Sequence, residues 1–298
     1  LVTFVNRKEI RPLSKTRDLG IDENWFPVPE TFTYQTSDSE KAHALFYSPT
    51  NPEYEISEKE KPPLIVLAHG GPTAAARRQL QLSITYWTSR GFGVADVDYR
   101  GSTGYGRSFR NRLRNSWGLA DVEDCVSVAK YLVEQKKVDK NKLAIKGGSA
   151  GGFTVLAALT FHDTFTAGAS RYGIADLAIL AKDTHKFESR YLDRLVGKWP
   201  EDEETYKQRS PIHHIEQLST PMVILQGSED PIVPPNQAHL MAQKLKENDI
   251  PHALIEFPDE GHGFRKAPNI TKAIESELAF FSHIFDFEPF DDLQKILF

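Results

Sequence analysis

Short apolar runs alternate with helix-like segments along most of the chain, and this alternation limits the available folds more than any other feature. Six such runs occur, at residues 64–68, 94–97, 143–145, 167–169, 222–225 and 253–257. Short runs of this kind are typical of strands buried on both faces of a parallel sheet. Residues 31–35 and 42–47 precede them and predict an antiparallel pair that opens the sheet.

Helical patterns fill the intervals between these runs. Two sets of apolar residues each share one helix face: Val122, Val126, Ala129 and Val133, and then Ala238, Met241 and Leu245. Strands that alternate with helices predict an α/β fold with helices on both sides of the sheet. We therefore expect a mostly parallel eight-stranded sheet flanked by helices over residues 31–298, with residues 1–30 as a lead-in segment.

Two segments depart from this rhythm. Residues 48–63 are dense in Glu, Lys and Pro and have no apolar periodicity, which predicts a surface loop. Residues 174–211 follow the fourth apolar run and contain Phe187, Tyr191 and Trp199 among charged residues. They predict either a cap over a pocket or a plain pair of surface helices.

Composition excludes several classes of function. The formal net charge of −5 gives no electrostatic reason to expect nucleic acid or an anionic membrane as partner. The apolar runs are strand-length, so no membrane-spanning segment is expected. No metal-ligand cluster or nucleotide-binding loop occurs, so we expect no metal and no cofactor. The single cysteine, Cys125, cannot form an internal disulfide, which favours a reducing, cytoplasmic location.

The sequence Gly-Gly-Ser-Ala-Gly at 147–151 lies between an apolar run and a helical stretch at 153–159. This is the strand–turn–helix context in which a G-x-S-x-G motif presents a nucleophilic serine. Glycines let the strand and the helix approach closely, and the helix N-terminus favours the negative charge of acyl transfer. We interpret Ser149 as a nucleophile.

A serine hydroxyl needs a base and an acid that orients the base. His262 lies in the glycine-flanked loop Glu-Gly-His-Gly-Phe just after the final expected strand, which makes it the preferred base. Asp230 follows the strand at 222–225 and precedes a proline, and is the preferred acid over its neighbour Glu229 and over Asp259. A helix-capping role for Asp230 is the alternative.

The oxyanion of acyl transfer needs two hydrogen-bond donors. Ala150 directly follows the nucleophile and supplies one backbone N–H. The second is expected after the strand at 64–68, where the chain reads His-Gly-Gly-Pro at 69–72, and we choose Gly71. His69 either touches the substrate or leaving group or makes a structural hydrogen bond.

Together, the His-Gly-Gly-Pro, Tyr-Arg-Gly-Ser-Thr-Gly-Tyr-Gly (99–106), Gly-Gly-Ser-Ala-Gly-Gly and Gly-His-Gly-Phe (261–264) motifs resemble the prolyl oligopeptidase family. Within that family, the motifs most resemble those of the acylaminoacyl-peptidase and dipeptidyl-peptidase branch. The resemblance implies an α/β-hydrolase fold, the triad Ser149, Asp230 and His262, and a substrate pocket that includes Tyr172 and Val233. Such proteins carry a β-propeller, and no propeller repeat occurs in these 298 residues.

The resemblance implies a serine peptidase that cleaves short or N-acylated peptides through an acyl-enzyme. A carboxylesterase is the alternative, because the same residues cleave esters. A non-catalytic interaction protein on a hydrolase fold is a third reading. A homo-oligomer is compatible with the sequence.

Overall fold

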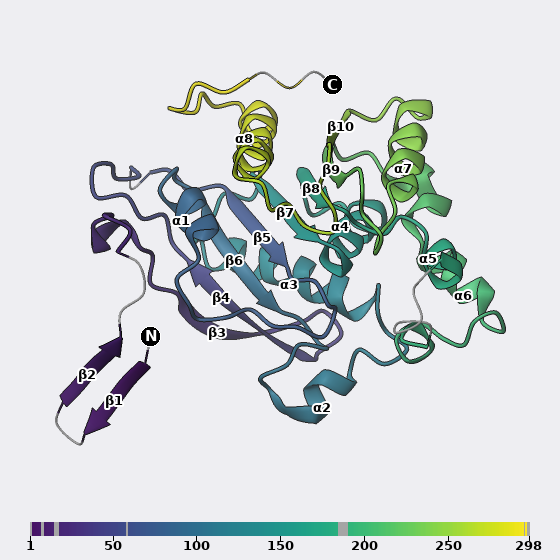
Figure 1. Ribbon diagram of the computed structural model, residues 1–298, viewed down its shortest axis with the longest axis horizontal. Helices are drawn as coiled ribbons and strands as arrows, with labels where there is room; N and C mark the ends of the chain where they lie inside the picture. Colours follow the sequence, from purple (N-terminus) through teal and green to yellow (C-terminus); the bar gives the residue numbers. More distant parts are fainter. Residues whose placement is uncertain are drawn as a thin grey trace.

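The computed structural model describes residues 2–6, 9–14, 18–57, 59–183, 190–294 and 296. An eight-stranded sheet forms the centre of the molecule, with the strand order β10-β9-β8-β7-β5-β6-β4-β3 (Figure 1). The neighbours from β10 to β6 pair in parallel, and β4 pairs antiparallel with both β6 and β3. The predicted mostly parallel eight-stranded sheet is confirmed.

The strands match the predicted segments to within three residues at each end. They are β3 (Glu30–Gln35), β4 (Lys41–Tyr47), β5 (Leu64–Ala68), β6 (Gly93–Asp98), β7 (Leu143–Gly148), β8 (Ala167–Arg171), β9 (Met222–Gly227) and β10 (His252–Phe257). The residues of β5 alternate between the two faces of the sheet, so that Val66 and Ile65 belong to different core clusters. The same strand therefore contributes to both layers of core.

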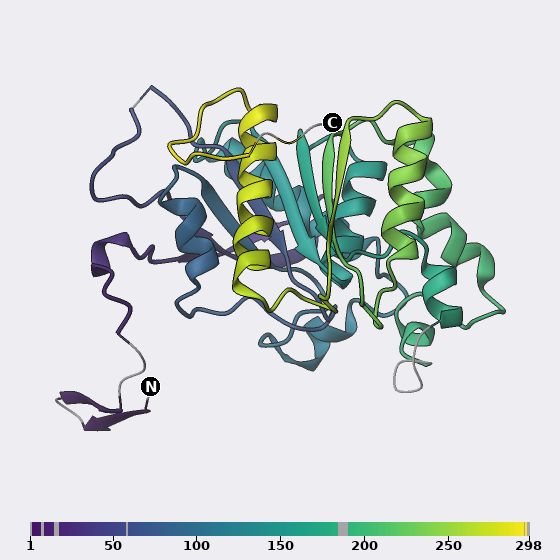
Figure 2. The same ribbon diagram turned by 45° about the horizontal axis from the view of Figure 1, so that its top comes forward.

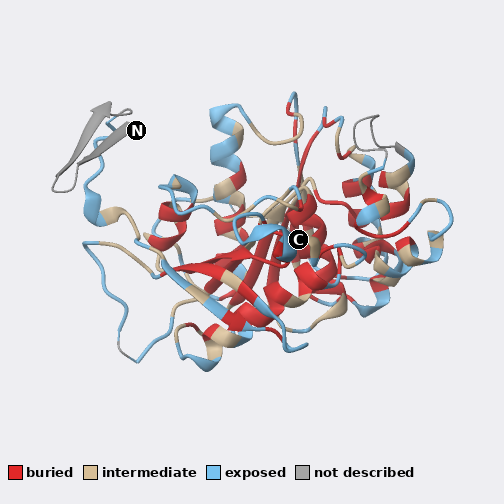
Figure 3. Cartoon of the chain, turned by 90° about the horizontal axis from the view of Figure 1, so that it is seen from below, coloured by how far each residue is buried: buried red, intermediate tan, exposed pale blue. Residues whose placement is uncertain are grey.

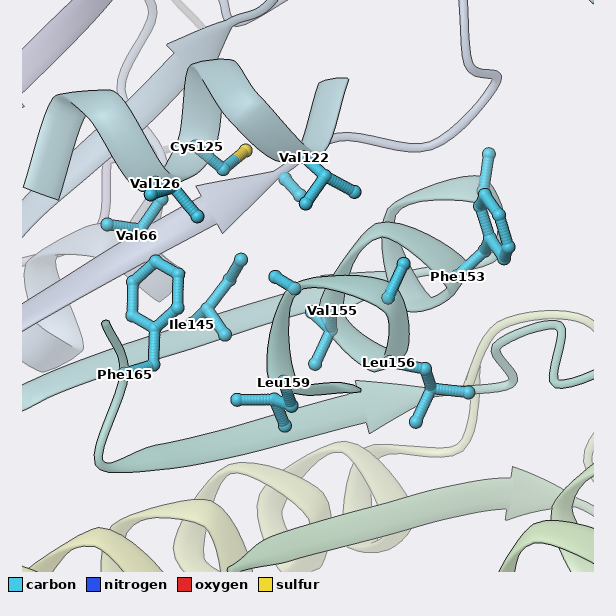
Figure 4. Close-up of a cluster of buried hydrophobic side chains, with 14 of the residues drawn as sticks. Val66, Val122, Cys125, Val126, Ile145, Phe153, Val155, Leu156, Leu159 and Phe165 are labelled. Atoms are coloured by element: carbon cyan, nitrogen blue, oxygen red, sulfur yellow. The ribbon is translucent and has the colours of Figure 1, made fainter. Parts of the chain in front are cut away.

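Helices cover both faces of the sheet (Figures 1 and 2). One face carries α1 (Leu82–Thr88) and α8 (Ala267–Ile284), which pack through Trp87 and Phe281 on Ile65 and its neighbours. The other face carries α3 (Ala120–Glu134), α4 (Ala150–Phe161) and α7 (Asn236–Glu247). Figure 4 shows α3 and α4 packing on this second face around Val66 and Ile145.

Buried residues are concentrated in the sheet and in the inward faces of these helices (Figure 3). Helix α4 is apolar on every side because it is enclosed, and all of Ala150 to Thr160 is buried. Among the described residues, no helix is long and apolar enough to cross a membrane.

The described parts of the segment that interrupts the rhythm, 174–183 and 190–211, form short helices. These are α5 (Leu177–Asp183), the 3₁₀ turn η2 (Leu192–Arg194) and α6 (Glu203–Arg209), followed by η3 (Pro211–Gln217). Leu192 and Tyr206 are buried in the same core cluster as α4, so this segment is packed on the domain. Phe187 lies outside the described residues.

Two further features complete the chain. The short helix α2 (Gly106–Asn111) follows β6, and η1 (Glu23–Trp25) precedes β3. Residues 48–57 and 59–63 form a loop without regular secondary structure, as predicted. Strands β1 (Val2–Asn6) and β2 (Glu9–Ser14) pair with each other in a separate two-stranded sheet. This hairpin was not predicted from the sequence, although residues 2–5 (Val-Thr-Phe-Val) have high β propensity.

Candidate active site

Ser149 occupies the tight turn between β7 and α4. Its backbone has φ 57° and ψ −123°, a strained conformation for a residue with a side chain. Its N–H donates to the carbonyl of Arg171 at 3.0 Å, which ties the turn to β8. A Cβ at Gly151 would lie 2.0 Å from the carbonyl oxygen of Ala68, so only glycine fits there. The strain at Ser149 is therefore imposed by close packing on both sides.

Ser149, His262 and Asp230 lie in one hydrogen-bonded chain. Ser149 Oγ is 2.9 Å from His262 Nε2, and His262 Nδ1 is 2.8 Å from Asp230 Oδ2. The Asp230 side chain is buried, and its Oδ1 accepts from the N–H groups of Ile232 and Val233 at 2.9 and 3.0 Å. Three donors thus fix the orientation of this carboxylate, which in turn orients the imidazole toward the serine. The structure brings together the three residues that the sequence selected from the segments after β7, β9 and β10.

The loop that carries His262 is held by Glu260, which the sequence analysis did not single out. The Glu260 carboxylate is buried and accepts from the backbone N–H groups of Arg265 and Lys266 and from Asn269 Nδ2, each at 2.9 Å. The hydrogen bond from Asn269, and then those from the two backbone N–H groups, hold the pKa of this carboxyl below its ordinary value against the effect of burial. Glu260 thereby fastens the His262 loop to the first turn of α8. An acid directly before Gly-His-Gly was the only local signal of this role.

The loop at 69–72 lies against the nucleophile. A Cβ on Gly70 would be 3.1 Å from the carbonyl oxygen of Gly148 and 3.6 Å from the Cβ of Ser149. Gly71 has φ +112°, a conformation that favours glycine, and Ala150 is the first residue of α4. The two expected oxyanion donors therefore belong to the two backbone segments that meet at Ser149.

Tyr191 supports this loop through hydrogen bonds, a role that the sequence did not predict. Its hydroxyl donates to the carbonyl oxygen of Gly71 at 2.7 Å and lies 3.4 Å from Thr73 Oγ1. The two partners are 120 residues apart in sequence, and no spacing rule links them. The 174–211 segment thus extends to the oxyanion loop, which agrees with the cap interpretation more closely than with a plain surface pair.

His69 is half-buried and has protein partners at both ring nitrogens. Nε2 lies 2.7 Å from Ser102 Oγ, and Nδ1 lies 2.8 Å from the carbonyl oxygen of Gly70. The ring stacks on Tyr99, with 4.1 Å between the centroids. Burial lowers the pKa of His69 to about 4, so the ring is neutral at pH 7. These contacts give His69 the structural role, and its ring also lines the cleft that contains Ser149.

The two residues expected in the substrate pocket lie in different environments. Tyr172 has its ring 4.8 Å from that of His262 and lines the cleft that contains Ser149. Val233 is 1% exposed, and its side chain is part of the core cluster on the α4 side of the sheet. Tyr172 is therefore positioned to contact a substrate, whereas the Val233 side chain is covered by its neighbours.

The cleft around Ser149 has a volume of about 720 Å³. A larger hollow of about 1230 Å³ lies between residues 48–57 and 60–62 on one side and residues 287–291 on the other, and it includes neither Ser149 nor His262. Because the chemistry depends on the serine and its base, the smaller cleft is the candidate site. Within the described part of the chain, no three His, Cys, Asp or Glu side chains are grouped so as to hold a metal ion.

Comparison with known proteins identifies the family of this chain. The model of the prolyl oligopeptidase family matches residues 78–288. The chain belongs to the prolyl oligopeptidase family. It is 32% identical to dipeptidyl peptidase family member 6 of Caenorhabditis elegans, over 69% of this chain and 29% of that protein. It is 31% identical to acylamino-acid-releasing enzyme 1 of Oryza sativa subsp. japonica, over 68% of this chain and 28% of that protein.

Solved structures of prolyl oligopeptidase family relatives match the whole α/β unit. A puromycin-hydrolyzing peptidase of Mycobacterium tuberculosis superposes with a TM-score of 0.93 at 42% identity. The match covers 97% of this chain and 44% of that one. The chain thus spans less than half the length of these relatives, and the α/β-hydrolase fold expected from the sequence is confirmed.

Proposed function

We propose that this chain is the catalytic part of a serine peptidase that cleaves short or N-acylated peptides through an acyl-enzyme. The observation that carries the proposal is the hydrogen-bonded chain from Ser149 Oγ through His262 to the buried Asp230 carboxylate. A buried carboxylate at Nδ1 stabilises the imidazolium that forms when Nε2 takes the serine proton. Family membership supports the peptide bond as the target.

The reaction follows from the positions of these atoms. His262 takes the proton of Ser149 as Oγ attacks the carbonyl carbon of the substrate, and it then gives that proton to the leaving nitrogen. We assign the backbone N–H groups of Gly71 and Ala150 to the oxyanion, with the positive end of α4 behind them. Tyr172 contacts the acyl residue in this proposal. Water then attacks the acyl carbon while His262 takes its proton, and His262 returns that proton to Ser149 Oγ as the acid product leaves.

Two measurements test the proposal. A fluorophosphonate probe should label the wild-type chain, whereas Ser149→Ala should not be labelled. Wild-type chain should also release amine from an acetyl-peptide amide bond, and puromycin is a further substrate to try, because a 42% identical relative is a puromycin-hydrolyzing peptidase. Turnover of p-nitrophenyl esters without turnover of any amide would favour a carboxylesterase. Failure of labelling would favour a non-catalytic protein.

We further propose that residues 31–298 constitute the catalytic domain and that the protein is cytoplasmic. The continuous sheet from β3 to β10 supports the first proposal, and the single buried Cys125 supports the second. Cell fractionation tests the location, and light scattering on the purified chain determines whether it forms a homo-oligomer.

A further inference from the structure

The cleft at Ser149 extends between α1 and α8 on one face of the sheet. Trp87 of α1 lines one side of it, and Ile270 and Ile274 of α8 line the other. His262 also lines the cleft, and α8 begins five residues after it, so the cleft adjoins the imidazole. His262 must contact the leaving nitrogen in order to protonate it. The leaving part of a substrate therefore has this cleft available to it.

Two cations on the floor of the cleft share one carboxylate. Lys146 of β7 pairs in register with Ala169 of β8. Arg171 lies two positions after Ala169 and therefore on the same face of the sheet. Both basic side chains thus face α8. Glu277 of α8 accepts from Arg171 Nε and Nη2 at 2.6 and 2.7 Å and from Lys146 Nζ at 2.5 Å. Although burial raises the pKa of the Glu277 carboxyl, Arg171 and Lys146 outweigh it and hold that pKa below its ordinary value.

This group of charges is not balanced. Burial lowers the pKa of Lys146 to about 8, so its ammonium group is still charged at neutral pH. Two positive side chains therefore face one negative side chain, and within the described residues Arg171 Nη1 donates no hydrogen bond. Arg171 is 22% exposed and lines the cleft together with Lys146. A single cation would be enough to neutralise a buried Glu277. The second cation therefore leaves a positive charge at the edge of the cleft, next to the turn that holds Ser149.

The other charged groups that line the cleft do not cancel this charge. Asp96 of β6 lies across β5 from Lys146, and burial, followed by repulsion from Asp98, raises the pKa of Asp96 to about 7. Its carboxyl is thus only partly ionised at neutral pH. Arg77 is exposed at the rim and adds positive charge. The cleft as a whole attracts an anion.

We propose that this cleft binds the leaving residue of the substrate through a carboxylate, which Arg171 and Lys146 recognise. The inference rests on the proposed peptidase function and specifies its substrate class: peptides whose residue after the scissile bond carries a negative charge. That charge is either the free α-carboxylate of a C-terminal residue or the side chain of Asp or Glu. Guanidinium–carboxylate contacts of this kind supply both energy and orientation.

Three substrates separate these sources. They are acetyl-Ala-Phe-Gly with a free C-terminus, the same peptide with a C-terminal amide, and acetyl-Ala-Phe-Glu with a C-terminal amide. Cleavage after Phe releases acetyl-Ala-Phe from each of them, and chromatography measures this product. We expect kcat/KM for the free acid to exceed that for its amide by about tenfold, the effect of one charge-assisted contact. If kcat/KM for the Glu amide equals that for the free acid, the side-chain carboxylate is recognised as well as the α-carboxylate. Low activity on the Glu amide would restrict recognition to the α-carboxylate.

Two variants should change this preference in opposite directions. Lys146→Met leaves Glu277 paired with Arg171 and removes the excess charge, so the acid-to-amide ratio should fall toward one. Glu277→Gln removes the shared anion, so the ratio should rise. Each ratio is measured within one preparation, which makes it independent of the folded fraction. Lys246→Met is the matched control, because Lys246 is exposed near the C-terminal end of α7, on the other face of the sheet.

The outcomes are distinguishable. Cleavage of both glycine peptides at equal rates by the wild-type chain would overturn the carboxylate site and leave the peptidase proposal standing. Cleavage of none of the three would count against the peptidase proposal itself. If the wild-type chain prefers the free acid and neither variant changes that preference, the carboxylate site is overturned. Lys146, Arg171 and Glu277 would then serve only to join α8 to the sheet.

Discussion

Replacement of Asp230 by Asn tests the proposed catalytic chain without removing volume from the site. In the wild-type chain, Oδ1 accepts from two backbone N–H groups and Oδ2 accepts from His262. The amide oxygen of the introduced Asn must take the place of Oδ1. In the opposite orientation, the NH₂ group of the Asn would face the N–H groups of Ile232 and Val233, and donors would face donors. Each buried donor left without a partner would cost about 1–3 kcal/mol.

The NH₂ group of the introduced side chain then points at His262 Nδ1, which must become an acceptor. The ring proton moves to Nε2, the atom that has to receive the proton of Ser149. We expect kcat to fall by about 10⁴-fold, which corresponds to about 5 kcal/mol of transition-state stabilisation. The melting temperature should change little, since the size of the side chain and both backbone hydrogen bonds are kept.

The assay is hydrolysis of an acetyl-peptide amide, together with the rate of labelling by a fluorophosphonate. Glu229→Gln is the control, because Glu229 is exposed beside Asp230 and was its rival in the sequence. It should keep wild-type activity. A loss of less than tenfold in Asp230→Asn, or an equal loss in Glu229→Gln, would refute the assignment of Asp230.

Three further changes probe the surroundings of the site. Tyr191→Phe removes the hydrogen bond to Gly71 and should lower kcat about tenfold with little change in KM, because the oxyanion loop loses its support. Steady-state kinetics measures both constants. A change in KM alone would mean that Tyr191 serves only in substrate binding. Asp96→Asn should raise the free energy of unfolding by about 2 kcal/mol at pH 8 and by half of that or less at pH 5. The sign follows from the pKa of the Asp96 carboxyl, which is about 7 in the folded state against an ordinary 3.8. Ionisation of Asp96 therefore destabilises the folded state fully above pH 7, and this destabilisation decreases as the pH falls toward 4. Urea titration at the two pH values measures it, and an equal gain at both would contradict the reasoning. Gly151→Ala should destabilise the fold by about 3 kcal/mol or more, since its Cβ would meet the backbone oxygen of Ala68; a wild-type melting temperature would count against the close packing.

The sequence alone determined the sheet, the turn at Ser149 and the order of the proposed triad. Each of these has a local signal. Buried strands are apolar runs, the turn needs small residues at fixed positions around the serine, and His262 is marked by flanking glycines. Such signals arise from the conformation of a few consecutive residues, and they are present before the chain folds.

Only the tertiary structure decided which distant side chains support the site. Tyr191 meets Gly71 across 120 residues, and Glu277 meets Lys146 across 131 residues. The Val233 side chain was expected in the substrate pocket, but it lies in the core. The direction of a side chain and its long-range partners depend on how helices pack on the sheet, and no spacing along the chain records that packing. The excess positive charge beside Ser149 is likewise a product of two strands and a helix that meet only in the folded protein.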